Sequence, residues 1–88
     1  QLFDIEIDNQ STQLTKNYYV PTNIGNKKIV NLQFIYKEVN GSLYRIYPPE
    51  FLKYYDSNAS SGQQSRILIE NIPPSFDIEG VLSIEYIN

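Results

Sequence analysis

The chain has 88 residues and a net charge of −3, from ten acidic and seven basic side chains. It contains neither cysteine nor histidine. This excludes disulfide bonds and thiolate metal sites, and it removes the usual general base near neutral pH. The acidic balance argues against a nucleic-acid partner, because such a partner requires a basic surface. The apolar runs are short, so we expect no membrane insertion.

A chain of 88 residues predicts a single domain, spanning residues 1–88. The sequence begins with Gln1, contains no methionine and has strand-like patterns at both ends. We therefore expect one module of a longer protein, in contact with neighbouring modules of the same chain or with another protein.

Two strands are predicted in the first quarter of the sequence. Residues 2–8 alternate apolar with acidic side chains, which predicts a strand with its apolar side chains facing a core. These inward side chains are Phe3, Ile5 and Ile7. Residues 14–23 predict a short second strand. Because Pro21 cannot donate a ladder hydrogen bond, this strand should lie at a sheet edge or end there.

The strongest strand pattern covers residues 29–39 and follows a predicted turn at residues 23–28. Its inward side chains should be Val30, Leu32, Phe34 and Tyr36. Asn40-Gly41 is a strong hairpin signal, because both residues tolerate a positive φ. We therefore expect residues 42–47 to return as the antiparallel partner of this strand.

The stretch YRIYPPEFLKYY, residues 44–55, is rich in aromatic residues and contains two adjacent prolines. Proline cannot donate to a ladder, so the preceding strand should stop at Pro48. Pro49 suits the first position of a helix, which predicts one short helical turn near residues 49–55, with an irregular edge segment as the alternative. The helical turn would place three rings on one face: Phe51, Tyr54 and Tyr55.

The second half of the chain predicts a loop and two further strands. Residues 56–65 are almost entirely polar and predict a surface loop. Residues 66–72 predict a strand, residues 73–80 a turn, and residues 81–88 a closing strand. The inward side chains of the closing strand should be Leu82, Ile84 and Tyr86.

About six or seven short strands separated by Gly, Pro and Asn turns predict an all-β fold, a small antiparallel β-sandwich. The segment 67–87 has a Pro-bearing corner, then an Asp and a Gly, and then a final alternating strand. It resembles the end of immunoglobulin-like modules of the bacterial Ig-like and TIG kinds, which implies an immunoglobulin-like sandwich. The chain departs from the antibody-type pattern, since it has no Cys pair and no Trp, and Leu82 replaces the Tyr of a tyrosine corner.

Motifs for catalysis and cofactor binding are absent from the sequence. Without His or Cys, a nucleophile–base pair would need Ser–Lys or two carboxylates. No Ser-x-x-Lys or Gly-x-Ser-x-Gly motif occurs, and the acidic pairs that are present alternate along predicted strand faces, where we expect solvated surface charge. The glycines are scattered singly, so no phosphate-binding loop is present. The acidic side chains of residues 4–8 lie along a flat strand face and do not converge as calcium requires. We therefore expect no enzyme activity, no cofactor and no metal, with calcium at Asp77 and Glu79 as the less favoured alternative.

The eight tyrosines allow two interpretations. Tyrosine suits the pleated, half-buried surface of a strand, so the rings can belong to the core. Tyrosine is also enriched at interfaces, because it joins an apolar ring to a polar tip. In the second interpretation an aromatic patch binds a protein or stacks on a sugar ring. Its residues would be Tyr47, Phe51, Tyr54 and Tyr55, with a ring of Tyr54 or Tyr55 exposed.

Three Asn-x-Ser triplets fall in predicted turns, where acceptor sites for N-glycosylation belong. They begin at Asn9, Asn40 and Asn58. They matter only in a source with a glycosylating secretory pathway.

Together these features favour a non-catalytic structural, adhesion or assembly module that acts through protein–protein contacts. Its expected location is extracellular, on a cell surface or in a virion. The alternative is a carbohydrate-binding module that uses exposed tyrosines.

Overall fold

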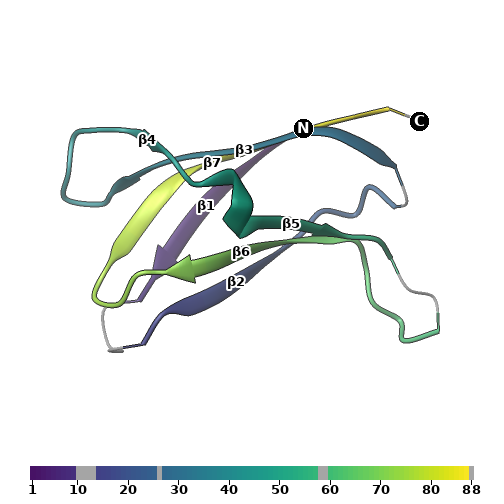
Figure 1. The fold of residues 1–88 in the computed structure, drawn as a ribbon, viewed down its shortest axis with the longest axis horizontal. Helices are drawn as coiled ribbons and strands as arrows, with labels where there is room; N and C mark the ends of the chain where they lie inside the picture. The colour runs from purple at the N-terminus through teal and green to yellow at the C-terminus, as the bar shows by residue number, and fades with distance from the viewer. Residues whose placement is uncertain (10–13, 26, 58–59, 88) are drawn as a thin grey trace.

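Seven strands and one short 3₁₀ turn form the part of the chain that the structure describes, which is residues 1–9, 14–25, 27–57 and 60–87. The structure is a computed structural model. The strands form two sheets packed face to face, which confirms the predicted all-β sandwich (Figure 1). The elements in chain order are β1 (Leu2–Asp8), β2 (Lys16–Pro21), β3 (Lys28–Glu38), β4 (Arg45–Ile46), η1 (Pro49–Phe51), β5 (Leu52–Tyr55), β6 (Arg66–Ile72) and β7 (Asp77–Ile87).

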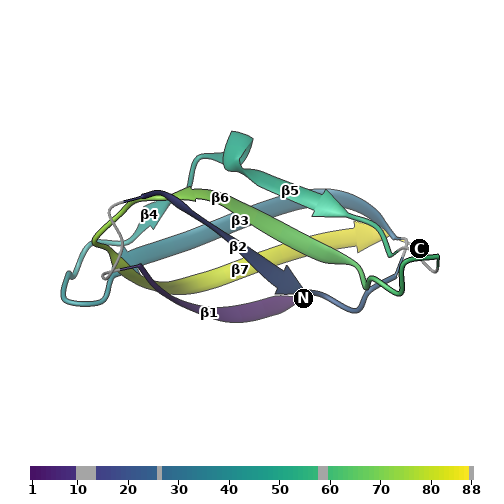
Figure 2. The ribbon, with the colours of Figure 1, turned by 90° about the horizontal axis from the view of Figure 1, so that it is seen from below.

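One sheet has the strand order β1–β7–β3–β4, and the other has the order β2–β6–β5. All neighbouring strands are antiparallel. In the view from below in Figure 2, the three-stranded sheet lies in front of the four-stranded sheet. Strands β6 and β7 have a neighbour on each side, and they supply most of the fully buried side chains. These are Ile67, Ile69, Ile72, Ile78, Leu82 and Ile84.

The first two strands match their sequence patterns. Ile5 and Ile7 are buried and Phe3 packs against the core, while the acidic side chains of β1 point outward. Full burial of a side chain such as Ile5 or Ile7 stabilises the fold by about 1.5–3 kcal/mol. Strand β2 lies at the edge of its sheet and ends at Pro21, as expected for a residue without an N–H donor.

The prediction for β3 is wrong at Val30. An irregularity in the pairing of β3 with β7, between Ile29 and Asn31, shifts the alternation by one residue. Because side chains alternate with a period of two, such a shift exchanges the faces of the strand. Ile29 therefore packs against the core, while Val30 is exposed. Beyond the irregularity the inward side chains are those expected: Leu32, Phe34 and Tyr36.

The hairpin after β3 differs from the one predicted at Asn40-Gly41. The N–H of Gly41 donates to the carbonyl of Glu38 (2.9 Å), so Val39 and Asn40 stand at the centre of the turn. Neither Asn40 nor Gly41 has a positive φ. The returning strand is also shorter than expected, because β4 pairs with β3 at only two positions. Residues 42–44 consequently form part of a loop.

The helical turn predicted near residues 49–55 is confirmed as the single turn η1, with Pro49 at its start. It ends at Phe51, and β5 begins at the next residue. Tyr54 and Tyr55 therefore point to opposite faces of a strand. The expectation that both would share a helical face with Phe51 is wrong.

Strand β7 begins earlier than the sequence predicts, at Asp77, because its first residues pair with β1 on one side and β3 on the other. The turn between β6 and β7 is shortened to residues 73–76. Tyr86 was expected to face inward, but its side chain is exposed near the end of the strand. The described residues of the segment 56–65 form the predicted loop.

Tyr47 lies where the chain crosses from one sheet to the other. Its N–H donates to the carbonyl of Phe34 in β3 (2.8 Å), and its hydroxyl donates to the carbonyl of Glu70 in β6. Its ring contacts those of Phe34, Tyr36 and Phe51, with centroids 5.7, 5.4 and 6.3 Å away. Burial, reinforced by the charges of Tyr36 and Glu70, raises the pKa of Tyr47 to about 12. Tyr47 therefore joins the two sheets and is held in its neutral, donating form.

We predict that Tyr47→Phe lowers the free energy of unfolding by about 1 kcal/mol at neutral pH, because the carbonyl of Glu70 loses its donor. The free energies of unfolding of the parent and of Tyr47→Phe should become more similar between pH 10 and pH 12. In that range the unfolded parent ionises Tyr47 near its ordinary pKa of 10.0 while the folded parent keeps the proton. The parent alone therefore loses this part of its stability as pH rises.

Urea denaturation across this pH range measures the effect. Tyr86→Phe is the control, because that ring is exposed near the end of β7. A constant difference between the parent and Tyr47→Phe up to pH 12 would contradict the prediction.

Candidate functional site

The aromatic residues predicted to form a contact patch lie in different environments. Tyr47 is only 4% exposed and belongs to the core. Phe51 and Tyr54 are half-buried, and the hydroxyl of Tyr54 donates to the carbonyl of Gly25 (2.5 Å). Tyr55 alone of the four is exposed. The four rings therefore do not form one surface, although the expectation that Tyr54 or Tyr55 stays outside is met by Tyr55.

The three predicted glycosylation acceptors also differ. Asn9 is 1% exposed, and its amide donates to the carbonyls of Leu14, Ile72 and Pro73. A glycan on that nitrogen is incompatible with this packing. Asn40 is exposed in the turn after β3, where a glycan would fit. Asn58 lies outside the described residues.

An apolar strip crosses the outer face of the four-stranded sheet. Ile35 in β3 pairs with Val81 in β7 on one side and with Ile46 in β4 on the other. Tyr44 precedes β4 and lines a hollow of about 320 Å³ that includes Val81. These four side chains, called here the outer apolar strip, are between 36% and 61% exposed. Exposed apolar side chains that gather across several strands mark interaction surfaces more often than isolated ones do.

Acidic side chains border this strip along β1. Asp4 stands opposite Val81, and Glu6 stands opposite Glu79, so two carboxylates face each other across the β1–β7 pair. Asp4, Glu6 and Glu79 line the same hollow as Tyr44. The strip therefore has an acidic border on its β1 side.

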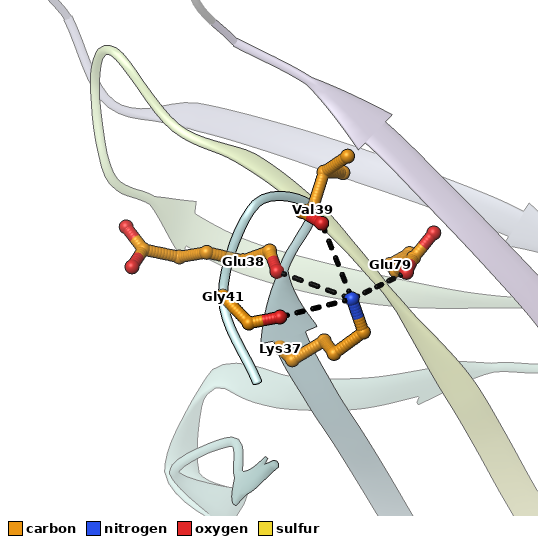
Figure 3. Close-up of polar contacts among 5 residues, drawn as sticks. All are labelled: Lys37, Glu38, Val39, Gly41 and Glu79. Carbon is orange, nitrogen blue, oxygen red and sulfur yellow. Dashed lines mark hydrogen bonds and ion pairs between the residues drawn. The ribbon is translucent and has the colours of Figure 1, made fainter. Parts of the chain in front are cut away.

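Lys37 shapes the loop that carries Tyr44. Figure 3 shows its ammonium surrounded by the turn after β3 and by Glu79. The ammonium lies 2.7 Å from a carboxylate oxygen of Glu79 and donates to the carbonyls of Glu38, Val39 and Gly41 at 3.5, 3.2 and 3.3 Å. The Lys37 side chain is only 16% exposed. The charge of Lys37 is thus satisfied within the molecule and is not available to a partner.

The same loop closes one end of the sandwich. Figure 1 places it at the same end as the turn between β6 and β7. A hollow of about 340 Å³ lies between them and includes the exposed side chain of Leu43. Apolar residues dominate the wall on the core side, where Tyr36, Pro73, Phe76 and Ile78 lie. The loop consequently joins the end hollow to the outer apolar strip.

A pair of carboxylates lies at the end of β1. Asp8 stands opposite Asp77, and like charges at such a position destabilise a strand pair. Burial, followed by the hydrogen bond and charge of Asp8, raises the pKa of Asp77, while the backbone N–H of Asn9 acts in the opposite direction. One oxygen of Asp77 is shielded from solvent although the residue as a whole is half-buried. Burial and the neighbouring carboxyl group of Asp8 therefore disfavour the charged form of Asp77.

In the part of the chain that the structure describes, no three acidic side chains are placed to hold a metal ion together. Within the same part, no helix is long and apolar enough to cross a membrane.

A second exposed group lies on the outer face of the three-stranded sheet. The guanidinium of Arg66 lies 5.8 Å from the ring centroid of Tyr19 and 5.0 Å from that of Tyr55. Both rings are exposed. We call these three residues the tyrosine–arginine platform. The sequence reasoning missed Tyr19 and Arg66; the Tyr18-Tyr19 doublet is the available signal, since adjacent strand residues face opposite ways.

Comparison of the chain with known protein families, with curated proteins and with solved structures finds no match. The resemblance to immunoglobulin-like modules therefore stays a prediction. The function must be inferred from the chemistry of the two exposed surfaces.

We predict that Lys37→Met lowers the free energy of unfolding by about 1–2 kcal/mol, because the turn carbonyls and Glu79 lose a charged donor. Lys53→Met is the matched control. Lys53 pairs with Glu70 at 2.9 Å, but its side chain is half exposed. An exposed pair of this kind contributes little to stability, because water and salt screen its charges. Thermal and urea denaturation measure the stability of both variants. Equal losses of stability in Lys37→Met and Lys53→Met would contradict a structural role specific to Lys37.

We predict that Asp77→Asn is more stable than the parent at pH 7, because an uncharged amide can still donate to Asp8. The folded parent has a raised pKa at Asp77, so its stability falls as pH rises through that pKa. The difference in stability between Asp77→Asn and the parent should therefore become smaller as the pH is lowered from 7 to 4. Asp4→Asn is the control, because its cross-strand neighbour is Val81. Urea midpoints at the two pH values give the test, and a variant less stable than the parent at pH 7 would overturn it.

Proposed function

We propose that this chain is a non-catalytic module that contacts another protein through the outer face of its four-stranded sheet. The outer apolar strip carries the proposal, because its side chains lie side by side on three strands and remain exposed. Apolar and aromatic side chains of this kind form the buried centre of protein–protein interfaces. No bond chemistry is required for such a role.

The charges around the strip define the partner. Asp4 and Glu6 line its β1 side, and the nearby Lys37 is already paired with Glu79. A partner that offers apolar side chains bordered by lysine or arginine would complement this surface. A second copy of this chain would present its own acidic border and lacks that complementarity.

Tyr44 is the residue that we expect to contribute most to binding. It belongs to the outer apolar strip and follows the turn whose carbonyls accept from Lys37, and its side chain is exposed. Tyrosine is enriched among the residues that dominate interface energies. A tyrosine side chain has only two rotatable torsions, so it also loses little conformational freedom on binding.

This function fits an extracellular, cell-surface or virion protein in which the module serves structure, adhesion or assembly. The partner is another protein or a neighbouring module of the same chain. The carbohydrate alternative loses the support of Tyr47 and Tyr54, because Tyr47 lies in the core and Tyr54 is half-buried and bonded to Gly25. The exposed rings of Tyr19 and Tyr55 are elsewhere, on the opposite sheet.

A photo-crosslinking experiment in the native source tests the proposal. We replace Ile46 with p-benzoylphenylalanine, and in a control chain we replace Lys53, which is exposed on the other sheet. We expect adducts at position 46 to exceed those at position 53, with the attached partner peptide containing apolar residues and lysine or arginine. Equal adducts at both positions, or adducts with a second copy of this chain, would contradict the proposal.

The purified partner then allows a binding measurement. We predict that Tyr44→Ala and Ile46→Ser each weaken binding by about tenfold or more. Lys53→Ser should leave the affinity unchanged. Binding should also weaken as salt is raised, because the acidic border acts through solvent-exposed charges. Unchanged affinity in both strip variants would place the interface elsewhere.

A further inference from the structure

The tyrosine–arginine platform has the composition of a ligand site. Tyr19 is 54% exposed and Tyr55 is 38% exposed, and both stand beside the guanidinium of Arg66 on one sheet face. We propose that this platform binds a carboxylate-bearing sugar, such as a uronic acid residue of an acidic polysaccharide. The proposal is independent of the proposed protein contact, because the two surfaces belong to opposite sheets (Figure 1).

The charge of Arg66 is available to a ligand. In the described residues the ion pairs join Lys37 to Glu79 and Lys53 to Glu70, and neither includes Arg66. The guanidinium makes one hydrogen bond to the chain, from Nη1 to the carbonyl of Gln64 (3.2 Å). A guanidinium has five N–H donors and matches the two oxygens of a carboxylate. An acidic ligand would therefore find both a positive charge and unused donors.

A hollow of about 290 Å³ lies beside the platform. Its size is near the lower limit for small-molecule sites, which suits one or two sugar rings. Tyr19 and Pro21 provide apolar walls, and the exposed amides of Gln63 and Gln64 can donate to and accept from sugar hydroxyls. Apolar walls with a few polar groups are the usual composition of such a site.

Hydrogen bonds fix the floor of the hollow at Ser65. Ser65 is buried, and its hydroxyl accepts from the N–H groups of Ile24 (3.1 Å) and Gly25 (3.2 Å). It also shares a hydrogen bond with the hydroxyl of Thr22 (2.9 Å). These contacts hold the start of β6, and hence Arg66, against the loop after β2. A site held in place before binding loses less freedom when the ligand arrives.

The neighbouring backbone favours a sugar over an extended acidic peptide. A peptide strand would gain affinity by pairing with the exposed edge of β2. That edge ends beside the hollow at Pro21, which has no N–H to donate. A sugar needs no ladder hydrogen bonds, and the C–H groups of its ring can pack on the exposed ring of Tyr19.

Nuclear magnetic resonance titration of the ¹⁵N-labelled chain tests this inference with three probes. These are trigalacturonate, the neutral trisaccharide maltotriose, and acetate. We expect trigalacturonate to shift the side-chain signal of Arg66 and the backbone amides of Tyr19, Gln64 and Tyr55. We expect maltotriose and acetate to bind at least tenfold more weakly than trigalacturonate. Maltotriose has no carboxylate for Arg66, and acetate has no sugar ring to pack on Tyr19.

Variants separate the platform from the rest of the surface. Arg66→Gln and Tyr19→Ala should each weaken trigalacturonate binding at least tenfold. Arg66→Lys keeps the charge but loses the paired donors, so it should also weaken binding while leaving the melting temperature close to that of the parent. Tyr86→Ala is the control, because that exposed ring lies in β7 of the opposite sheet and belongs to neither proposed surface.

Several results would overturn the inference. Absence of shifts with trigalacturonate at millimolar concentration excludes the site. Equal binding of acetate reduces the platform to a simple anion site, and equal binding of maltotriose removes the role of the carboxylate. Equal or tighter binding of the peptide Ala-Glu-Ala would assign the platform to an acidic protein partner. None of these results affects the outer apolar strip, whose test uses other residues.

Discussion

The contacts of Tyr47 hold this domain together, because they are made where the chain passes from one sheet to the other. Its backbone donates to β3, its hydroxyl donates to β6, and its ring packs against Phe34, Tyr36 and Phe51. Shortly after it, η1 leads into β5, whose position is fixed by pairing with β6. The anchor and this pairing together carry the chain from one sheet to the other, and the alternation of side chains along β5 turns Tyr55 outward.

The outer faces of the two sheets differ in chemistry, because strand pairing places different side chains next to one another on each sheet. On the four-stranded sheet, cross-strand pairing places carboxylates opposite each other near the start of β7 and apolar side chains opposite each other farther along. Lys37 offsets part of this negative charge and also holds the adjoining loop. On the three-stranded sheet, pairing places Arg66 beside two tyrosines without an acidic partner among the described residues. One face is thus apolar with an acidic border, and the other is aromatic and basic.

Both proposed activities are recognition without bond chemistry, and they follow from residues that the fold leaves exposed. The proposed protein contact is inferred from exposed apolar side chains with an acidic border. The proposed sugar site is inferred from a guanidinium that lies near two exposed tyrosine rings. The two can coexist in one module, because the surfaces lie on opposite sheets.

The sequence by itself determined the local features of this protein. The alternation in β1, the edge position that Pro21 suits and the turn that starts at Pro49 depend on neighbouring residues or on proline geometry, so their patterns were sufficient. Only the tertiary structure decided which aromatic rings are exposed. Tyr47 became the core anchor because β3 and β6 supply its acceptors, and Val30 turned outward because pairing with β7 introduces an irregularity. Arg66 and Tyr19 belong to strands that are distant in sequence and meet only through sheet pairing, which local periodicity does not encode.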